Sequence, residues 1–401
     1  MNMKIDAVIY IGNYKFPMGD AIAKRALGLG KAFSHAGYKV LFIDESDAVS
    51  RGDISEVKKY EEFEYCSIHH SANSVEHYFY WSDLKKIKNQ IEVWSKQYSV
   101  AAIIFCGTKC AFLAKGIVDY AKRKKISIIA DSMDWLTSQT GNFLFDALKQ
   151  LDTTLEIKVV NQKTDGVICI SEFLEKYYKT KKKRTLLIPP LSPYKRPEKI
   201  ESQSKKVRLI YAGVPCRLGK KLVNPGTAKD RLDLAIQMLY EISNEGVDFE
   251  FIIYGLSKEQ YDIVFSEQRE VINDLVRKKK IFFYGKQSEA IVREAVKLAD
   301  FTILLRERNR TSMAGFPTKI AESITLGTPV ITTDTSDIKR YLEDGKSATF
   351  LNLYEWEEAK KKLRNLLLLD EKARRERKKS VLKNNSFVPE YYAELLKNFL
   401  R

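Results

Sequence analysis

Short apolar segments alternate with amphipathic helical patterns along nearly the whole chain of 401 residues. The segments are rich in Val and Ile on both faces, which is typical of strands in parallel sheets that helices cover on each side. The expected strands of the first half are residues 5–11, 39–43, 100–105, 127–130, 166–170 and 185–188. Helical patterns lie between several of them, at residues 21–35, 108–124 and 143–163. The alternation predicts an α/β protein.

One segment breaks this alternation near the middle of the chain. Residues 189–206 carry four prolines among polar and charged residues, which is typical of a linker. Strands then resume at residues 207–213, 249–254, 281–284, 301–305, 330–333 and 348–351. The expected helices between and after them are residues 230–243, 258–276, 288–299, 317–326 and 389–400. We therefore expect two tandem Rossmann-like, doubly wound domains, residues 1–195 and 205–385, that face each other across a cleft.

The charge balance favours an anionic partner. Lys and Arg number 68 against 52 Asp and Glu, a formal net charge of +16. A nucleotide sugar, an anionic lipid surface and a nucleic acid would all suit this charge, although no RNA-binding or helix-turn-helix signature is present. No 18-residue apolar span and no secretory signal are evident, and the five cysteines lack zinc-finger spacing. We expect a cytoplasmic protein.

The run Gly-Phe-Pro-Thr-Lys at residues 315–319 predicts a helix start suited to phosphate. Pro317 fits the first helical position, and the unpaired N–H groups and dipole at this end favour an anion such as a diphosphate. Thr318 and Glu322 share one face, and Lys319 and Ser323 share the adjacent one. We expect these five residues to bind a ligand, with Glu322 accepting bonds from sugar hydroxyls. An ordinary αβ unit with a capping proline is the alternative.

Two further cations follow expected strands of the second half. The strand at 207–212 leads into Gly213, whose lack of a side chain lets a ligand approach, and later into Lys229 at a helix start. Lys229 is the first candidate to neutralise diphosphate oxygens; a solvated lysine is the alternative. Arg306 ends the strand at 301–305 and is either a ligand contact or a surface arginine. Arg308 and Arg310 are expected at the surface.

The first half offers two loops at strand ends. Gly19 and Asp20 follow the first strand, and Asp20 is expected to cap the helix at 21–35. Asp131 and Asp134 end the strand at 127–130, where they predict either a cleft function or caps and turns. Ser171 is expected to cap the helix that follows it.

Taken together, these motifs resemble the retaining nucleotide-sugar glycosyltransferases of family 4, in the variant with Phe-Pro-Ser/Thr-Lys before a glutamate. The Tyr-Ala-Gly-x-Pro and Lys-Asp-Arg-Leu runs at 211–215 and 229–232 are similar to elements of polysaccharide-building members. The resemblance covers nearly the whole chain and implies the GT-B fold, with a terminal helix at about 387–401 that packs back onto the first domain. It departs from the family at Ala314, where the first glutamate of the Glu-x7-Glu pair would stand, which puts the usual contact to the donor sugar in doubt.

The resemblance implies roles for the residues above. Glu322 would bind the nucleotide ribose, and Lys229 and Arg306 would stabilise the departing diphosphate. Asp134 would bind sugar or acceptor, and the loop with Gly19 and Asp20 would face donor phosphate and acceptor. The implied activity is transfer of a sugar from a nucleotide diphosphate sugar, with UDP expected, to a saccharide or glycoconjugate acceptor such as a lipid-linked or protein-linked glycan.

No cofactor and no metal are expected, because the chain has no Asp-x-Asp motif. The absence of Gly-x-Gly-x-x-Gly after the first strand argues against a dehydrogenase, and Arg340 replaces the leading glycine of a P-loop before Gly345, Lys346 and Ser347. Peripheral contact with an anionic membrane face is a further expectation. The leading alternative is a non-catalytic GT-B homologue that binds a glycan or partner protein. A basic nucleic-acid-binding protein is the third alternative.

Overall fold

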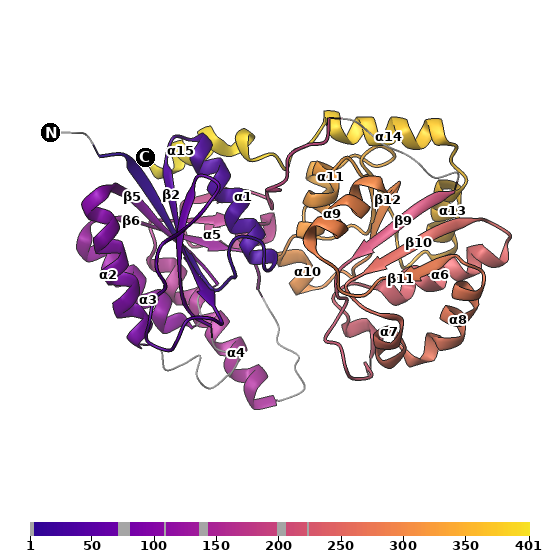
Figure 1. Ribbon diagram of the computed structural model, residues 1–401, viewed down its shortest axis with the longest axis horizontal. Helices are drawn as coiled ribbons and strands as arrows, with labels where there is room; N and C mark the ends of the chain where they lie inside the picture. Colours follow the sequence, from indigo (N-terminus) through magenta and orange to yellow (C-terminus); the bar gives the residue numbers. More distant parts are fainter. Residues whose placement is uncertain (1–3, 71–80, 108–109, 136–142, 199–205, 223) are drawn as a thin grey trace. The chain divides into compact units, whose positions relative to one another are not determined.

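The computed structural model describes residues 4–70, 81–107, 110–135, 143–198, 206–222 and 224–401. The chain divides into two compact units, each a sheet flanked by helices (Figure 1). Unit 1 comprises Met1–Pro193, Met313–Thr318 and Val388–Arg401. Unit 2 comprises Tyr194–Ser312 and Lys319–Phe387.

The sheet of unit 1 is almost entirely parallel. Its described strands are β1 (Asp6–Gly12), β2 (Lys39–Ser46), β3 (Lys58–Tyr60), β4 (Phe63–His69), β5 (Ser99–Cys106), β6 (Ser127–Ser132), β7 (Gly166–Cys169) and β8 (Thr185–Leu187). They lie in the order β3-β4-β2-β1-β5-β6-β7-β8, and only the short β3 runs antiparallel to its neighbour. This parallel order follows from the buried strands and intervening helices that the sequence predicts.

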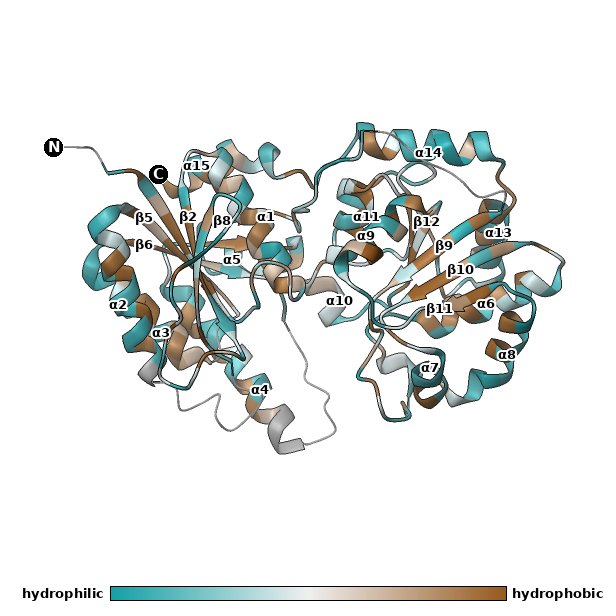
Figure 2. Ribbon diagram, viewed as in Figure 1, coloured by the Kyte–Doolittle hydropathy of each residue, from teal (hydrophilic) through white to brown (hydrophobic). Residues whose placement is uncertain are grey.

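Helices flank this sheet, and most of them bury an apolar face. They are α1 (Ala21–His35), α2 (Trp81–Gln97), α3 (Ala111–Lys124), α4 (Phe143–Leu155), α5 (Glu172–Thr180) and the terminal α15 (Ala393–Leu400). Helix α4 is the exception, because Leu148 and Leu151 are exposed. The strands and the covered helix faces are the apolar parts of the ribbon (Figure 2). Leu396 and Phe399 of α15 lie in the same core cluster as Val8 and Phe42. Arg184 lies over the Phe399 ring, 4.7 Å from its centroid, and donates to the Phe399 carbonyl oxygen.

The sheet of unit 2 is parallel throughout its described strands. These are β9 (Val207–Ala212), β10 (Phe249–Tyr254), β11 (Ile281–Phe283), β12 (Phe301–Leu304), β13 (Val330–Thr332) and β14 (Ala348–Phe350), in the order β11-β10-β9-β12-β13-β14. The direction of winding reverses between β9 and β12. In doubly wound sheets, ligands bind beyond the carboxyl ends of the strands at such a reversal.

Nine helices accompany the second sheet among the described residues. They are α6 (Leu232–Asn244), α7 (Lys258–Val264), α8 (Arg269–Arg277), α9 (Glu289–Leu298), α10 (Arg310–Ala314), α11 (Thr318–Thr325), α12 (Ile338–Tyr341), α13 (Trp356–Leu367) and α14 (Glu371–Lys383). Helix α14 is fastened to the unit by two buried cations. Arg374 pairs with Asp300 at 3.0 Å, and Lys378 Nζ donates to the Ala299 carbonyl oxygen at 2.6 Å.

Three elements differ from the sequence predictions. The hairpin of β3 and β4 was not expected, because its apolar residues alternate with polar ones instead of forming a continuous run. The helix expected at 258–276 is two helices, because Phe265 leaves the helical conformation and packs on Tyr261 with ring centroids 4.8 Å apart. The helix expected at 143–163 ends at Leu155 and continues as a π-helical turn, Glu156–Val160.

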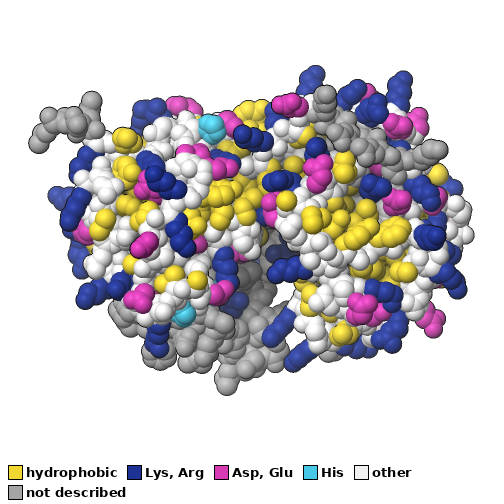
Figure 3. Space-filling model, in the orientation of Figure 1, with side chains coloured by type: hydrophobic (Ala, Val, Ile, Leu, Met, Phe, Trp, Pro, Cys, Tyr) yellow, Lys and Arg dark blue, Asp and Glu magenta, His cyan; other side chains and the backbone are white. Residues whose placement is uncertain are grey.

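The surface agrees with the basic composition. Lys and Arg side chains are spread over both units on the face shown in Figure 3. Within the described part of the chain, no helix combines the length and the apolar character that crossing a bilayer requires.

Candidate functional site

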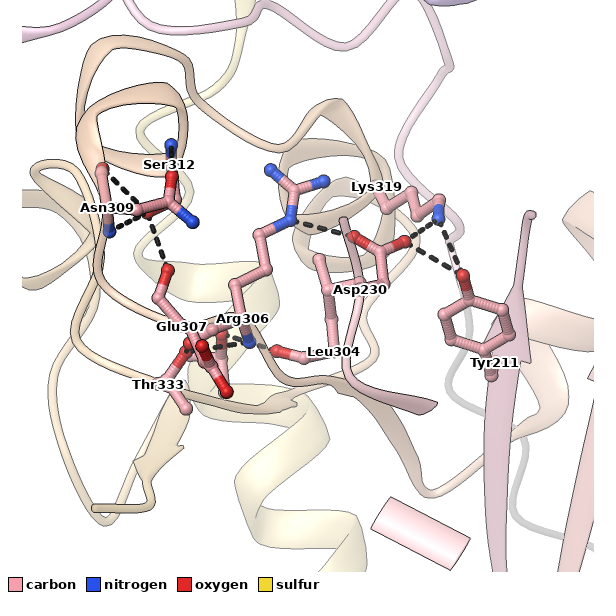
Figure 4. Close-up of polar contacts among 10 residues, drawn as sticks. Tyr211, Asp230, Leu304, Arg306, Glu307, Asn309, Ser312, Lys319 and Thr333 are labelled. Atoms are coloured by element: carbon pink, nitrogen blue, oxygen red, sulfur yellow. Dashed lines mark hydrogen bonds and ion pairs between the residues drawn. The ribbon is translucent and has the colours of Figure 1, made fainter. Parts of the chain in front are cut away.

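A buried carboxylate organises the carboxyl edge of the second sheet. Asp230 lies just before α6 and is 1% exposed. Its Oδ2 accepts from Lys319 Nζ at 2.6 Å and from the Tyr211 hydroxyl at 2.8 Å, and its Oδ1 accepts from Arg306 Nε at 2.8 Å (Figure 4). We call these four residues the Asp230 cluster.

The fold brings the cluster together at the reversal of the sheet. Tyr211 belongs to β9, and Arg306 lies two residues after the end of β12, so the two residues come from the pair of strands that flanks the reversal. The backbone of Arg306 is held on both sides by Thr333. Its N–H donates to Thr333 Oγ1 at 3.0 Å, and that hydroxyl donates to the Arg306 carbonyl oxygen at 2.7 Å. The guanidinium is therefore mounted on a fixed backbone.

The electrostatics of the cluster leave a positive surplus. Burial alone would raise the pKa of Asp230, but the Lys319 ammonium and the Arg306 guanidinium outweigh it and hold this pKa well below its usual value. Asp230 is consequently ionised, and its single negative charge faces two positive ones. Burial lowers the pKa of Lys319, and the nearby charges of Arg306 and Lys229 lower it further against the opposing effect of Asp230. An anion that reaches this edge would relieve the repulsion among these cations.

Gly213 and Lys229, which the sequence predicts as ligand contacts, border the cluster. Gly213 follows β9 with a φ of +151°, and a Cβ there would collide with the Lys319 side chain. Its lack of a side chain is therefore what admits Lys319. Lys229 is exposed, and its backbone N–H donates to the Pro215 carbonyl oxygen at 2.9 Å. Its charge acts on Lys319, so it stands beside the cluster without being buried in it.

The predicted ligand-binding residues of α11 lie on two sides of the helix, one half-buried and the other packed in the core. The helix begins at Thr318, one residue later than predicted, so Pro317 precedes it, and Thr318, Lys319 and Glu322 are half-buried. Ser323 is 1% exposed, and its Oγ lies 2.7 Å from Thr302 Oγ1 and 2.8 Å from the Thr328 carbonyl oxygen. Ser323 therefore faces the core, because its side of the helix packs on β12, and contact of Ser323 with a ligand stays a prediction.

The arginines that follow β12 differ in exposure. Arg306 is 7% exposed, which rejects the surface alternative, whereas Arg308 and Arg310 are exposed as expected. A pocket of about 530 Å³ opens beside Arg306 along the carboxyl ends of β12, β13 and β14. Its lining includes Asp334, Lys339 and the exposed ring of Tyr354.

The first loop of unit 1 is fixed by Asp20. Its Oδ1 accepts from the Ala23 N–H at 2.7 Å and its Oδ2 from the Lys15 N–H at 3.0 Å, so the predicted cap of α1 is confirmed. Gly19 closes the turn by donating its N–H to the Lys15 carbonyl oxygen at 2.8 Å. Both residues shape the loop, and contact of this loop with a ligand stays a prediction.

The two acids after β6 have different environments. Asp131 is 4% exposed and forms a buried ion pair with Arg25, whose Nη2 lies 2.6 Å from Oδ1. Tyr10 donates to the other oxygen at 2.5 Å, so Asp131 is neither a cap nor a cleft residue. Asp134 is half-buried in the loop beyond the strand. Ser171 caps α5 as expected, accepting from the Leu174 N–H at 3.4 Å.

Two members of the cluster were missed by sequence reasoning. Asp230 directly follows Lys229 in one predicted motif. Tyr211 lies two residues before Gly213 in the other. From the sequence alone, a carboxylate beside a lysine at a helix start is interpreted as an exposed, solvated ion pair. Only the burial of Asp230 shows that it orients the cations.

Residues 223–382 match the family model described as "Glycosyl transferases group 1". No curated protein sequence matches the chain. Three of the solved structures that it resembles span nearly its whole length at low identity. Sucrose-phosphate synthase from Thermosynechococcus elongatus is 13% identical, with a TM-score of 0.64 and 98% of each chain covered. The structure described as "Trehalose-6-phosphate from E. coli bound with UDP-2-fluoro glucose" is 12% identical, with a TM-score of 0.63 and 98% of each chain covered.

A third similar structure is that of HepE from Anabaena in complex with UDP and glucose. It is 10% identical, with a TM-score of 0.60 and 99% of each chain covered. At these identities the likeness shows the fold. The chain therefore has the two-domain GT-B fold, and its second half carries a region that matches the group 1 glycosyltransferases.

Proposed function

We propose that the protein is a retaining glycosyltransferase that moves a sugar from a UDP-sugar to a saccharide or glycoconjugate acceptor. The observation that carries the proposal is the Asp230 cluster, in which one buried carboxylate orients Arg306 and Lys319 at the ligand edge of the sheet. Two of the similar structures hold UDP-2-fluoro glucose or UDP with glucose, which supports UDP as the nucleotide.

The diphosphate of the donor would lie against the cations of unit 2. Arg306, Lys319 and Lys229 would compensate its charge, together with the N–H groups at the start of α11 near Thr318. Because Asp230 and Thr333 already hold Arg306, little reorganisation is needed when negative charge develops on the leaving group. A preorganised donor of this kind contributes roughly 3–4 kcal/mol to transition-state stabilisation. In this account no metal ion and no cofactor are required.

The transfer breaks the bond between the anomeric carbon and the β-phosphate oxygen and forms a bond from that carbon to the acceptor hydroxyl oxygen. The acceptor proton passes to the departing diphosphate on the same face of the sugar, so no enzymic nucleophile takes part. Glu322 would accept bonds from the ribose hydroxyls. Asp134 and the loop of Gly19 would serve the acceptor. The basic surface favours peripheral contact with an anionic membrane that carries a lipid-linked acceptor.

The experiment that tests the activity is turnover with a panel of UDP-sugars and GDP-sugars against saccharide and lipid-linked acceptors, followed by the release of free nucleotide. The anomeric configuration of the product, read by NMR, tests retention. Transfer with inversion would reject the retaining mechanism and leave the donor site in place.

A second function is favoured by one observation. Ala314, where the family has a glutamate, is fully buried and offers no carboxylate to a donor sugar. A non-catalytic homologue that binds a glycan or a partner protein would bind nucleotide or glycan without turnover. Tight binding of a UDP-sugar with no nucleotide release over the whole acceptor panel would favour that alternative.

A further inference from the structure

Tyr194, the first residue of unit 2, lies against the carboxylate that we assign to the ribose. Its hydroxyl donates to Glu322 Oε2 at 3.5 Å. The ring packs on a core cluster that includes Tyr254, Val296 and Leu326. The contact therefore joins a residue within the predicted linker, residues 189–206, to helix α11.

A second helix holds the same tyrosine from the other side. The Arg293 guanidinium of α9 lies over the Tyr194 ring, 5.6 Å from its centroid. Glu289, one turn earlier on α9, pairs with Arg293 at 3.6 Å and is a further acceptor for the Tyr194 hydroxyl. The single phenolic hydrogen thus lies between two carboxylates, which accounts for the long contact to Glu322.

The hydroxyl stays a donor throughout the working pH range. Burial raises the pKa of Tyr194 far above its ordinary value, and the Glu322 carboxylate raises it further. A neutral phenol can only donate to an ionised carboxylate. The bond fixes the position of Glu322 Oε2. Because the carboxylate is planar and rigid, the direction of Oε1 is fixed as well.

We propose that Tyr194 is a positioning residue that holds the Glu322 carboxylate in the orientation that receives the ribose hydroxyls of a nucleoside diphosphate. The inference rests on the proposed function, because the ribose contact of Glu322 belongs to it.

The test compares UDP with 2′,3′-dideoxy-UDP by isothermal titration in four proteins: wild type, Tyr194→Phe, Glu322→Ala and Tyr261→Phe. Phenylalanine keeps the ring and removes only the hydroxyl. Tyr261 is the matched control, because its hydroxyl donates to Gln268 instead of Glu322. Thermal unfolding of each variant confirms that it is folded.

In Tyr194→Phe the affinity for UDP is expected to fall about three- to tenfold, the effect of one hydrogen bond, while the affinity for dideoxy-UDP is unchanged. Glu322→Ala removes the discrimination between the two nucleotides, and Tyr261→Phe leaves it intact. Equal losses for both nucleotides in Tyr194→Phe, or no loss for either, would overturn the positioning role alone. A wild-type protein that binds neither UDP nor GDP would overturn the proposed function itself and this role with it.

Discussion

The ammonium nitrogen of Lys319 lies 2.6 Å from Oδ2 of Asp230, although the two residues belong to different elements of the second sheet's ligand edge. The carboxylate is buried, whereas about a quarter of the lysine side chain is exposed. The buried Asp230 carboxylate therefore orients the Lys319 ammonium, and part of the Lys319 side chain stays exposed to solvent. We expect the stability of unit 2 and its proposed affinity for a diphosphate to depend on this pair.

Removing the carboxylate should destabilise the protein strongly. Asp230→Asn leaves Arg306 and Lys319 close together without their counter-charge, and breaking a buried pair in this way costs about 3–5 kcal/mol of unfolding free energy. Urea denaturation measures the change. Asp119→Asn, which breaks an exposed pair with Lys115, is the control and should cost roughly 0.5 kcal/mol or less. Equal losses of unfolding free energy in the two variants would show that Asp230 stabilises the protein no more than an exposed ion pair does.

Lys229 should matter for turnover and hardly at all for folding. Its side chain is exposed, so Lys229→Ala is expected to leave the unfolding free energy unchanged while kcat falls about 10²–10³-fold through loss of leaving-group stabilisation. Lys221→Ala is the matched control in the same loop, where the lysine pairs with Glu267 at 3.4 Å. Steady-state kinetics with the active donor decides the matter. A Lys229→Ala enzyme as fast as the control would remove Lys229 from the transition state.

Affinity for the donor should decline at a lower pH than it would if Lys319 had the pKa of an ordinary lysine. The pKa of Lys319 is lowered in the free protein, and a bound diphosphate would raise it again because it favours the charged form. Affinity is therefore full below the lowered pKa and is lost as pH rises through it, and binding in that range takes up protons. Calorimetry of UDP binding in buffers of different ionisation enthalpy measures the uptake. Proton release on binding would contradict the assignment.

The unfolding free energy should depend on pH through Asp44, which holds the first loop of unit 1. This residue is 2% exposed and accepts from the Phe16 N–H at 2.7 Å, and burial raises its pKa to about 7. Because the folded pKa lies above the unfolded one, its contribution to stability is present at low pH and is lost as pH rises towards 7. Asp44→Asn should raise the unfolding free energy at pH 8 by at most about 4 kcal/mol and change it little at pH 4. A gain of equal size at both pH values would contradict this explanation.

The ligand edge could be located from the sequence because parallel strands bury both faces and end at one side of the sheet. Gly213 and Arg306 follow strands that were expected as continuous apolar runs, and both lie at the predicted edge. Asp230 could not be assigned its role in the same way. Its partners come from β9, α11 and the end of β12, and nothing local in the sequence indicates which distant side chains will meet a given carboxylate.

Helical periodicity predicts which residues of α11 share a face, but it does not predict what each face packs against. Lys319 and Ser323 were placed on one face, yet Lys319 extends to Asp230 whereas Ser323 is bonded to Thr302 and Thr328 in the core. The missed hairpin of β3 and β4 has a similar cause. A strand at the margin of a sheet alternates polar and apolar residues and lacks the continuous run that identifies a central strand.

Titration of UDP against uridine tests the central claim most directly, because the two ligands differ only in the diphosphate that the cations of unit 2 would hold. Wild-type protein should bind UDP about 10²-fold or more tightly than uridine, as expected for two charge-assisted contacts, and added salt should weaken only UDP. Lys319→Met should remove most of that difference. Equal affinity for UDP and uridine, or a preference that Lys319→Met leaves untouched, would contradict the account.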